Sequence, residues 1–457
     1  MKLRRSAIRR QAHALPELQF ANQSLTSFSG LVLFQQLFAV LQLTARLRAC
    51  FRHLAPGKVF GPATLFLQLV VHLLLGFRNL RDSRAYRDDP LVKRLLGLSR
   101  LPDVSTLSRL LQHADARTVD HVRRLLRDLV FERLASLGLT RLTLDFDGSV
   151  QSTRRHAEGT AVGYNKKRKG ERSYYPLFCT IAQTAQVLDL LHRSGNVHDS
   201  NGAREFMLAC IQAVRTALPG IRIEVRLDSA FFGDAIVTAL QDAGVEFSLS
   251  VPFERFTELK GMIEQRRRWR ISGGVSYFED DWKPKAWDRR YRFLFIRTRA
   301  VRQYKKPIQL DLFIPHETGY DFKVIVSNKT LGAAHVVAFH EGRGSQEGIF
   351  GELKTHCAMG YVPVRRRWGN ELYLLAGLLA HNLTRELQMR TTPPVRHTTP
   401  GRAALWTFEK LDTLRQTLLH RAGRLTRPQG ILTLTLNANL WTRGQFLQLL
   451  QKLRPAA

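Results

Sequence analysis

LTLDFDGS, the stretch from Leu142 to Ser149, marks the point at which the chain changes from helical patterns to strand patterns. Its apolar residues predict a strand that ends at Asp147. A second apolar run, residues 221–227, ends in the same way at Asp228. The sheet fixes the backbone of an acid at a strand end and leaves its oxygens exposed, so both aspartates are candidate metal ligands.

A third acid, Glu347, follows in the stretch RGSQE at residues 343–347, where a helix is predicted to begin. Lys354 lies seven residues further on, a spacing that places both side chains on one helix face. Two strand-end acids and one helical acid can hold two divalent cations, and such a metal pair can drive phosphodiester chemistry. Any one of the three acids alone would be interpreted as an ordinary solvated carboxylate.

Asp145 is a further candidate, because it shares the strand face of Asp147 two residues earlier. It could be the ligand itself or a group that supports the ligand. Asp147 is favoured because Gly148, which follows it, leaves room for a ligand to approach.

The composition indicates a partner of opposite charge. The chain has 457 residues, with 70 lysines and arginines against 38 acids and a net charge of +32. Such a surplus favours nucleic acid, because each neutralised phosphate releases condensed counterions. A membrane surface and the ribosome are the alternative partners, but the chain has no long basic tail. Its most apolar segment, residues 65–76, is shorter than the ~20 residues that cross a membrane, so no membrane contact is expected.

The patterns divide the chain into three parts. Residues 1–139 predict an all-helical N-terminal domain, with helices near 31–47, 65–75, 91–96 and 116–137; we expect it to bind DNA, and a helical packing module is the alternative. Residues 140–390 predict an α/β domain, in which three strands, a helix, a strand, a helix and a strand follow one another. This is the order of an RNase H-like catalytic core.

Two further segments complete the organisation. Residues 255–335 are too long for a loop and carry strand patterns at 291–297, 309–315 and 320–327, which predicts a β-rich insertion. Residues 391–457 begin with a proline-rich linker and then predict a helix near 403–421, a strand at 431–436 and a last helix. This C-terminal region is a candidate for dimerisation.

On these motifs the chain resembles DDE-type insertion-sequence transposases, in the cut-and-paste branch with a β-strand insertion before the glutamate. That branch carries a spaced signature of tyrosine, arginine, glutamate and lysine. The spacing falls on His340, Arg343, Glu347 and Lys354, with histidine where the tyrosine is expected. The aspartate motifs at residues 147–149 and 226–229 match as well.

The resemblance implies the chemistry and the ligands. Asp147, Asp228 and Glu347 would bind two Mg²⁺ ions, with Mn²⁺ as a substitute, and would cleave DNA at the ends of a mobile element before strand transfer into target DNA. Arg343 and Lys354 would bind the DNA backbone. His340 belongs to the same DNA-binding signature.

In some members of the resembled family, an aromatic residue of the insertion stacks on a flipped base. Trp282 and Trp287 are candidates for this contact, and the alternative is that both pack inside the insertion. A homodimer is expected in the DNA complex because two element ends must be brought together.

The expected location is the bacterial cytoplasm, in association with the nucleoid; four isolated cysteines without CxxC pairs fit a reducing compartment. Two rival functions remain open. One is an RNase H-like nuclease without strand transfer, and the other is a DNA-binding protein that has lost catalysis.

Overall fold

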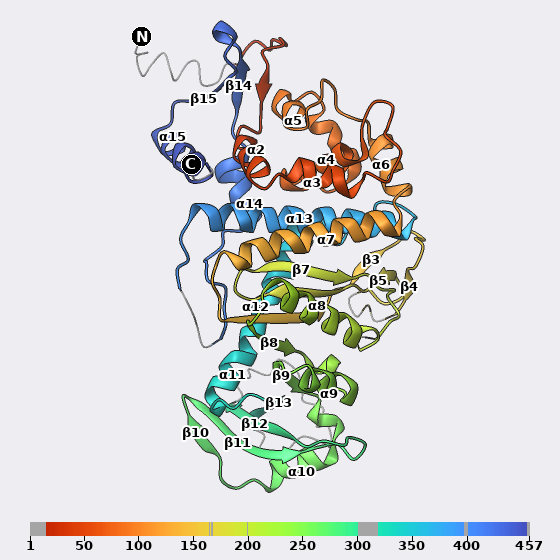
Figure 1. The fold of residues 1–457 in the computed structure, drawn as a ribbon, viewed down its shortest axis with the longest axis vertical. Helices are drawn as coiled ribbons and strands as arrows, with labels where there is room; N and C mark the ends of the chain where they lie inside the picture. Colours follow the sequence, from red (N-terminus) through yellow and green to blue (C-terminus); the bar gives the residue numbers. More distant parts are fainter. Residues whose placement is uncertain are drawn as a thin grey trace.

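The structure is a computed structural model that describes residues 15–163, 165, 168–198, 200–299, 319–396 and 401–454. Figure 1 shows an elongated molecule with the N-terminal helices at one end and the strands of the insertion at the other end. The remaining strands of the main sheet lie between them. The N-terminal helices are α2 (Leu31–Val40), α3 (Leu43–Cys50), α4 (Pro62–Leu74), α5 (Pro90–Leu95), α6 (Val104–Gln112) and α7 (Ala116–Ala135).

The prediction of a single helix over residues 31–47 is wrong, because the segment forms two helices, α2 and α3. Gln42 has a φ of 51°, in the left-handed region that does not continue an α-helix. The break allows Leu37 and Leu47 to be buried from two differently directed helices. The other expected helices of this part, near 65–75, 91–96 and 116–137, are confirmed as α4, α5 and α7.

In the described part of the chain, nine strands form one mixed sheet in the order β10-β11-β12-β13-β9-β8-β2-β6-β7. Strands β2, β8 and β9 are parallel to one another, and the other neighbours are antiparallel. The strands are β2 (Arg141–Gly148), β6 (Leu177–Ile181), β7 (Gln186–Leu191), β8 (Arg222–Leu227), β9 (Glu246–Val251), β10 (Arg270–Ser272), β11 (Val275–Trp282), β12 (Tyr291–Arg299) and β13 (Tyr320–Ser327).

Helices cover the two faces of the sheet. On one face, Phe178 packs 5.3 Å from the ring of Phe350 in α12 (Ser345–His356), in a core that also includes α13 (Arg367–Thr391). On the other face, Phe146 packs against Phe206 of α8 (Ala203–Ala217), next to α9 (Asp234–Asp242). Figure 1 shows α7 and α13 side by side between the N-terminal helices and the sheet.

The insertion extends the main sheet. Strand β13 pairs antiparallel with β9, so β10 to β13 continue the sheet at that edge, followed by α11 (Ala333–Glu341). The expected strands at 291–297 and 320–327 are confirmed as β12 and β13, whereas the one at 309–315 lies outside the described residues. The helix α10 (Thr257–Gln265) precedes these strands.

The C-terminal region returns to the N-terminal helices. The helix expected over residues 403–421 is much shorter than predicted. In the described residues of this segment, α14 spans only Leu411–Leu414, and one π-helical turn follows. The side chain of Arg415 is buried and donates to the carbonyl oxygens of Leu74 and His356, at 2.8 and 2.7 Å. Strands β14 (Gly423–Thr426) and β15 (Thr433–Leu436) then form a small sheet with β1 (Leu25–Thr26), before α15 (Leu440–Lys452).

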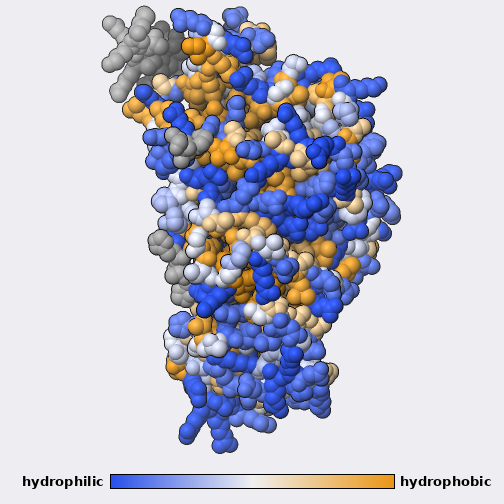
Figure 2. Space-filling view, in the orientation of Figure 1, coloured by the Kyte–Doolittle hydropathy of each residue, from blue (hydrophilic) through white to orange (hydrophobic). Residues whose placement is uncertain are grey.

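Apolar residues gather on the surface near this C-terminal sheet, whereas hydrophilic residues cover the end that carries the insertion (Figure 2). No helix in the described residues is long and apolar enough to span a bilayer. A third small sheet, β3 (Gln151–Thr153), β5 (Arg172–Tyr174) and β4 (Ala161–Val162), follows the end of β2.

Candidate active site

The strand pairing brings Asp147 and Asp228 together. Strands β2 and β8 are parallel neighbours, and their last paired residues are Asp145 and Arg226. Asp147 and Asp228 each follow these paired residues by two positions, at the carboxyl ends of the two strands, and neighbouring strands are about 4.8 Å apart. The two aspartates, predicted from separate motifs, therefore meet at one edge of the sheet. We call this edge, together with the first turn of α12, the acid edge.

Asp147 is the last acid of β2 and is partly exposed. Its side chain has 21% of its surface exposed, and its Oδ2 lies 3.3 Å from Nη1 of Arg343. Its Oδ1 accepts a hydrogen bond from the backbone N–H of Gly148 at 2.7 Å. A Cβ at position 148 would lie 2.6 Å from the ring of Tyr175, so this ring fills the space expected for a ligand.

Asp228 follows β8 and begins a short 3-10 turn at Ser229–Phe231. Its Oδ1 accepts a hydrogen bond from the N–H of Ala230 at 2.9 Å, which fixes the carboxylate at the strand end. The residue is partly buried.

Glu347 reaches the acid edge through the start of α12. The neighbouring residue, Gln346, donates from Nε2 to the carbonyl oxygen of Asp145 at 3.0 Å. Arg343, in the 3-10 turn before α12, contacts Asp147. These two contacts hold the first turn of α12 against the end of β2, and Glu347 is exposed on that turn.

The three acids are chemically suited to a hard cation. Carboxylate oxygens are the protein ligands that Mg²⁺ prefers, and partly exposed oxygens at the end of rigid strands can be reached by an ion. Among the described residues, however, no three acidic, histidine or cysteine side chains already stand within one metal's reach. The structure thus brings the acids to one edge without closing a metal site around them.

His340 lies inside the protein. Only 2% of its surface is exposed, and its ring nitrogens lie 3.0 Å from Ser248 Oγ and 2.8 Å from Ser250 Oγ. Burial and the positive charges of Lys323 and Arg343 lower the pKa of His340 well below its ordinary value. The ring is therefore neutral, and it contacts serines of β9 inside the protein.

Trp282 and Trp287 also lie inside, in agreement with the packing alternative. Trp282 packs edge-on against Phe293 and donates from its indole N–H to Glu258, while Trp287 stacks on Phe232. Both belong to the main core on the α8 side of the sheet. Stacking on a base would require them to leave this core.

Asp145 is paired with Arg226, which the sequence patterns did not single out. The guanidinium binds both carboxylate oxygens of Asp145, at 2.5 and 2.6 Å, and both side chains are buried. Arg226 also donates to the carbonyl oxygens of Phe339 and Gly401, at 3.0 and 2.7 Å. Asp145 is thus saturated by an internal partner, which leaves Asp147 as the acid at the strand end.

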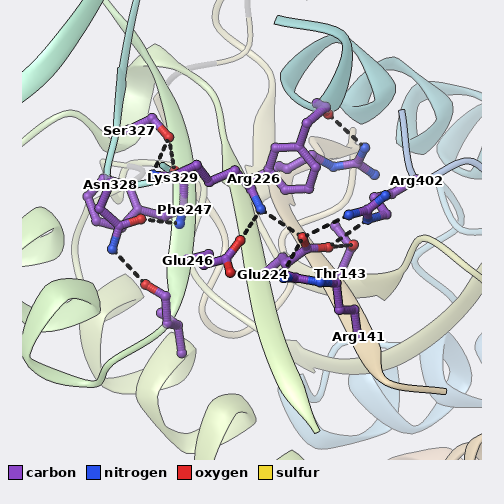
Figure 3. Close-up of polar contacts among 12 residues, drawn as sticks. Arg141, Thr143, Glu224, Arg226, Glu246, Phe247, Ser327, Asn328, Lys329 and Arg402 are labelled. Carbon is purple, nitrogen blue, oxygen red and sulfur yellow. Dashed lines mark hydrogen bonds and ion pairs between the residues drawn. The ribbon is translucent and has the colours of Figure 1, made fainter. Parts of the chain in front are cut away.

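A second buried network, centred two residues before Arg226 in β8, was also not predicted from the sequence (Figure 3). Glu224 of β8 accepts hydrogen bonds from Thr143 at 2.8 Å, Lys329 at 2.7 Å and Arg402 at 3.1 Å. Burial alone would raise the pKa of Glu224, but Lys329 and Arg402 hold it below its ordinary value. The charged alternation of β8, IEVRLD, was the only signal in the sequence, because the partners come from distant segments.

Comparisons with known proteins identify the family of the chain. A family model described as Transposase DDE domain group 1 matches residues 12–457. The piggyBac transposase synaptic complex with hairpin DNA is 12% identical, with 86% of this chain and 80% of that chain covered and a TM-score of 0.38. No curated protein matches the sequence.

Two structures of Mos1 mariner complexes are also similar over part of the chain. The paired-end complex with Mn is 12% identical, with 43% of this chain and 60% of that chain covered and a TM-score of 0.17. The paired-end complex with Mg is 10% identical, with 42% and 58% covered and a TM-score of 0.16.

Proposed function

Because the chain belongs to the transposases with a group 1 DDE domain, we propose that Asp147, Asp228 and Glu347 are its catalytic acids. The protein is a DNA transposase. The reaction proposed for it is cleavage of DNA at the ends of an element, followed by transfer of the freed strands into target DNA. If one copy of the chain binds each of the two element ends, the active form is a homodimer.

One observation carries the proposal. Asp147 and Asp228 lie at the carboxyl ends of two strands that pair in parallel, and α12 is tied to the same edge by Gln346 and Arg343. The strand order β7-β6-β2-β8-β9, with two antiparallel neighbours followed by two parallel ones, supports an RNase H-like core.

Two Mg²⁺ ions, or Mn²⁺ in their place, would supply an activated water or 3′-hydroxyl and stabilise the leaving oxygen. The residues present would hold them through the carboxylates of Asp147, Asp228 and Glu347. The backbone N–H groups of Gly148 and Ala230 orient the two aspartates. Because β2 and β8 fix both backbones, the aspartates would need little rearrangement to bind a cation.

Arg343 and Lys354 flank Glu347 and are proposed to bind phosphate oxygens. Arg343 reaches the acid edge directly, since it contacts Asp147. Lys354 lines a groove together with Gly148 and Ser149, next to Asp147. His340 is proposed to position the turn that carries Arg343, because it anchors the end of α11 to Ser248 and Ser250.

The test is a cleavage and strand-transfer assay on DNA that carries the element ends, with Mg²⁺ or with EDTA. We expect metal-dependent cutting and joining by the wild type. Glu347→Gln and Asp228→Asn should each lower the rate of DNA cleavage by at least about 100-fold. Loss of a residue that only supports a metal ligand costs up to about 100-fold, and loss of a ligand itself should cost no less. Glu341→Gln is the matched control, since Glu341 is an exposed glutamate at the end of α11.

Each alternative outcome has a separate meaning. Cutting without joining would favour the RNase H-like nuclease. Binding without cutting under every condition would favour a DNA-binding protein that has lost catalysis. Normal cleavage by Asp228→Asn would remove Asp228 from the catalytic set.

A further inference from the structure

A first groove begins beside Asp147. It has a volume of about 500 Å³ and opens next to the strand end at Gly148 and Ser149. Three cations line it, Arg78, Arg168 and Lys354, and they come from three distant segments. We call it the near groove.

A second groove lies further from the acid edge and has a volume of about 800 Å³. One wall is helix α6, which contributes Ser108 and Gln112. The opposite side contributes four basic residues, Arg155, His156, Arg365 and Arg366, all of them exposed. We call it the far groove.

The two grooves follow one another along the same pair of segments. Residues 151–155 and 361–363 are held together by Gln151, which donates to the carbonyl oxygen of Tyr361, and by Arg155, which donates to that of Pro363, each at 3.4 Å. The near groove includes Ser152 of the first segment, and the far groove includes Arg155. The two grooves are therefore lined by successive residues of the same two segments.

The lining of both grooves has one sign of charge. None of the described residues that line either groove is acidic. The closest carboxylate contact of the far groove is Arg366 to Glu158 at 3.9 Å, between two exposed side chains. In the basic groove around residues 289–292, by contrast, Arg289 and Arg292 are bound to Asp242 and Glu279 at 2.5 and 2.7 Å. A cation held this closely by a carboxylate is less able to bind a phosphate, whereas Arg168 of the near groove lies at the longer distance of 3.4 Å from Glu171.

We propose that the near and far grooves form one track for the phosphodiester backbone of a DNA strand, which runs from the acid edge to helix α6. The inference rests on the proposed function and assigns a surface to its DNA. Arginine, serine and glutamine side chains are common phosphate ligands, and such contacts fix the register of a duplex. Ser108 and Gln112 lie four residues apart on one face of α6 and are joined by a hydrogen bond of 3.3 Å, so α6 offers neutral donors opposite the arginines.

The length of the track sets its footprint. From Gly148 to Arg155 is seven residues, which span at most about 23 Å when extended. Successive phosphates along one strand of B-DNA advance by roughly 3.4 Å along the helix axis. The far groove would thus contact the backbone no more than about seven nucleotides from the cleavage point.

The test is the salt dependence of duplex binding by the full chain, measured by fluorescence anisotropy with labelled element-end DNA in EDTA. EDTA keeps the DNA uncut, so binding is measured apart from catalysis. Arg365→Ala with Arg366→Ala should lower the slope of log affinity against log salt by about 1.8, at 0.9 per phosphate contact, which is about 60-fold in affinity at 0.1 M salt. The matched control is Arg267→Ala with Arg268→Ala, an exposed arginine pair in the insertion, which should change the slope by less than half as much.

Shortened duplexes locate the contact. DNA that ends at the cleavage point, on one side or the other, should abolish the difference between the wild type and the far-groove variant for one of the two truncations. The track is excluded if both arginine pairs change the slope equally, or if truncation on either side leaves the difference intact. If the wild type binds the full-length end and the far-groove variant binds it equally well, the proposed track is wrong, but the proposed function is not affected. Failure of the wild type to bind DNA overturns the proposed function as well.

Discussion

Strands β2 and β8 carry acidic residues both in their middle and at their carboxyl ends, and the two groups have different surroundings. In the middle, Asp145 and Glu224 are buried and hold Arg226 and Lys329. At the end, Asp147 keeps a fifth of its side-chain surface exposed, with its arginine contact at the longer distance of 3.3 Å. The two groups are only two or four residues apart along the same strands.

The difference follows from the cost of burying charge. A buried carboxylate is tolerated only when a cation and hydrogen bonds replace water. Asp145 and Glu224 therefore bind side chains from β8, from the segment after β13 and from residue 402, and this fixes how these segments pack. An acid at the strand end keeps contact with water, so a metal ion can reach it. Position along the strand separates structural acids from candidate catalytic ones.

The largest effect on stability is expected from breaking the middle pair. Arg226→Ala leaves Asp145 as an uncompensated buried charge and removes the donors to Phe339 and Gly401. Removal of one partner of a buried pair typically costs about 3–5 kcal/mol. Urea denaturation should therefore show a loss of that size in the free energy of unfolding.

The matched variant is Asp145→Leu with Arg226→Met, which replaces the pair by apolar groups. Because a buried pair is often no more stabilising than apolar side chains of similar volume, the double variant should recover at least half of the loss. A loss below about 1 kcal/mol in Arg226→Ala would show that Asp145 is not held by this pair.

The sequence predicted the elements that carry the candidate site better than the elements around them. The run at 142–149 and the run at 221–227 each indicated a strand that ends in an acid, and both strands are present. Local patterns suffice here, because a buried strand is recorded in consecutive apolar residues.

The missed features depend on contacts between distant segments. Neither Lys329 nor Arg402 carries a local sign that it binds Glu224, which lies 105 and 178 residues away in sequence. The helix expected over 403–421 is cut short where Arg415 turns inward to bind carbonyl oxygens of α4 and the end of α12. The preference for Asp147 over Asp145 rested on Gly148, whereas the structure separates the two acids through Arg226, a contact that no pattern within one strand can supply.

A smaller loss, with a pH signature, is expected from Glu224→Gln. Lys329 keeps its second carboxylate, Glu246, so the variant loses charge-assisted hydrogen bonds worth about 2 kcal/mol without orphaning the ammonium group. The pKa of Glu224 is lowered on folding, so its contribution is fully present above the ordinary value of 4.5 and is lost as the pH falls through the lowered value. The unfolding free energies of the variant and the wild type should differ at pH 7 and converge at pH values well below 4.5.

This prediction is checked by urea denaturation at a series of pH values. A difference that stays constant down to pH 3 would mean that the charge of Glu224 contributes nothing and that shape alone explains the loss. Glu341→Gln, at an exposed glutamate, serves as the control and should leave the curve unchanged.

The smallest change in stability is expected at the strand end, from Asp228→Asn. The amide oxygen can still accept from Ala230, and the change removes a like charge from the strand ends that carry Asp147 and Asp228, so the metal-free variant should match or exceed the wild type by up to about 1 kcal/mol. Mg²⁺ at ten times its dissociation constant should stabilise the wild type by about 1.4 kcal/mol, and the variant should lose most of this gain. Thermal unfolding with and without Mg²⁺, at constant ionic strength, measures both. If the metal-free variant instead loses about 3 kcal/mol of unfolding free energy, Asp228 belongs with the structural acids in the middle of the strands. A loss of that size is expected only where the folded protein pairs the carboxylate with a buried cation or hydrogen-bond donor.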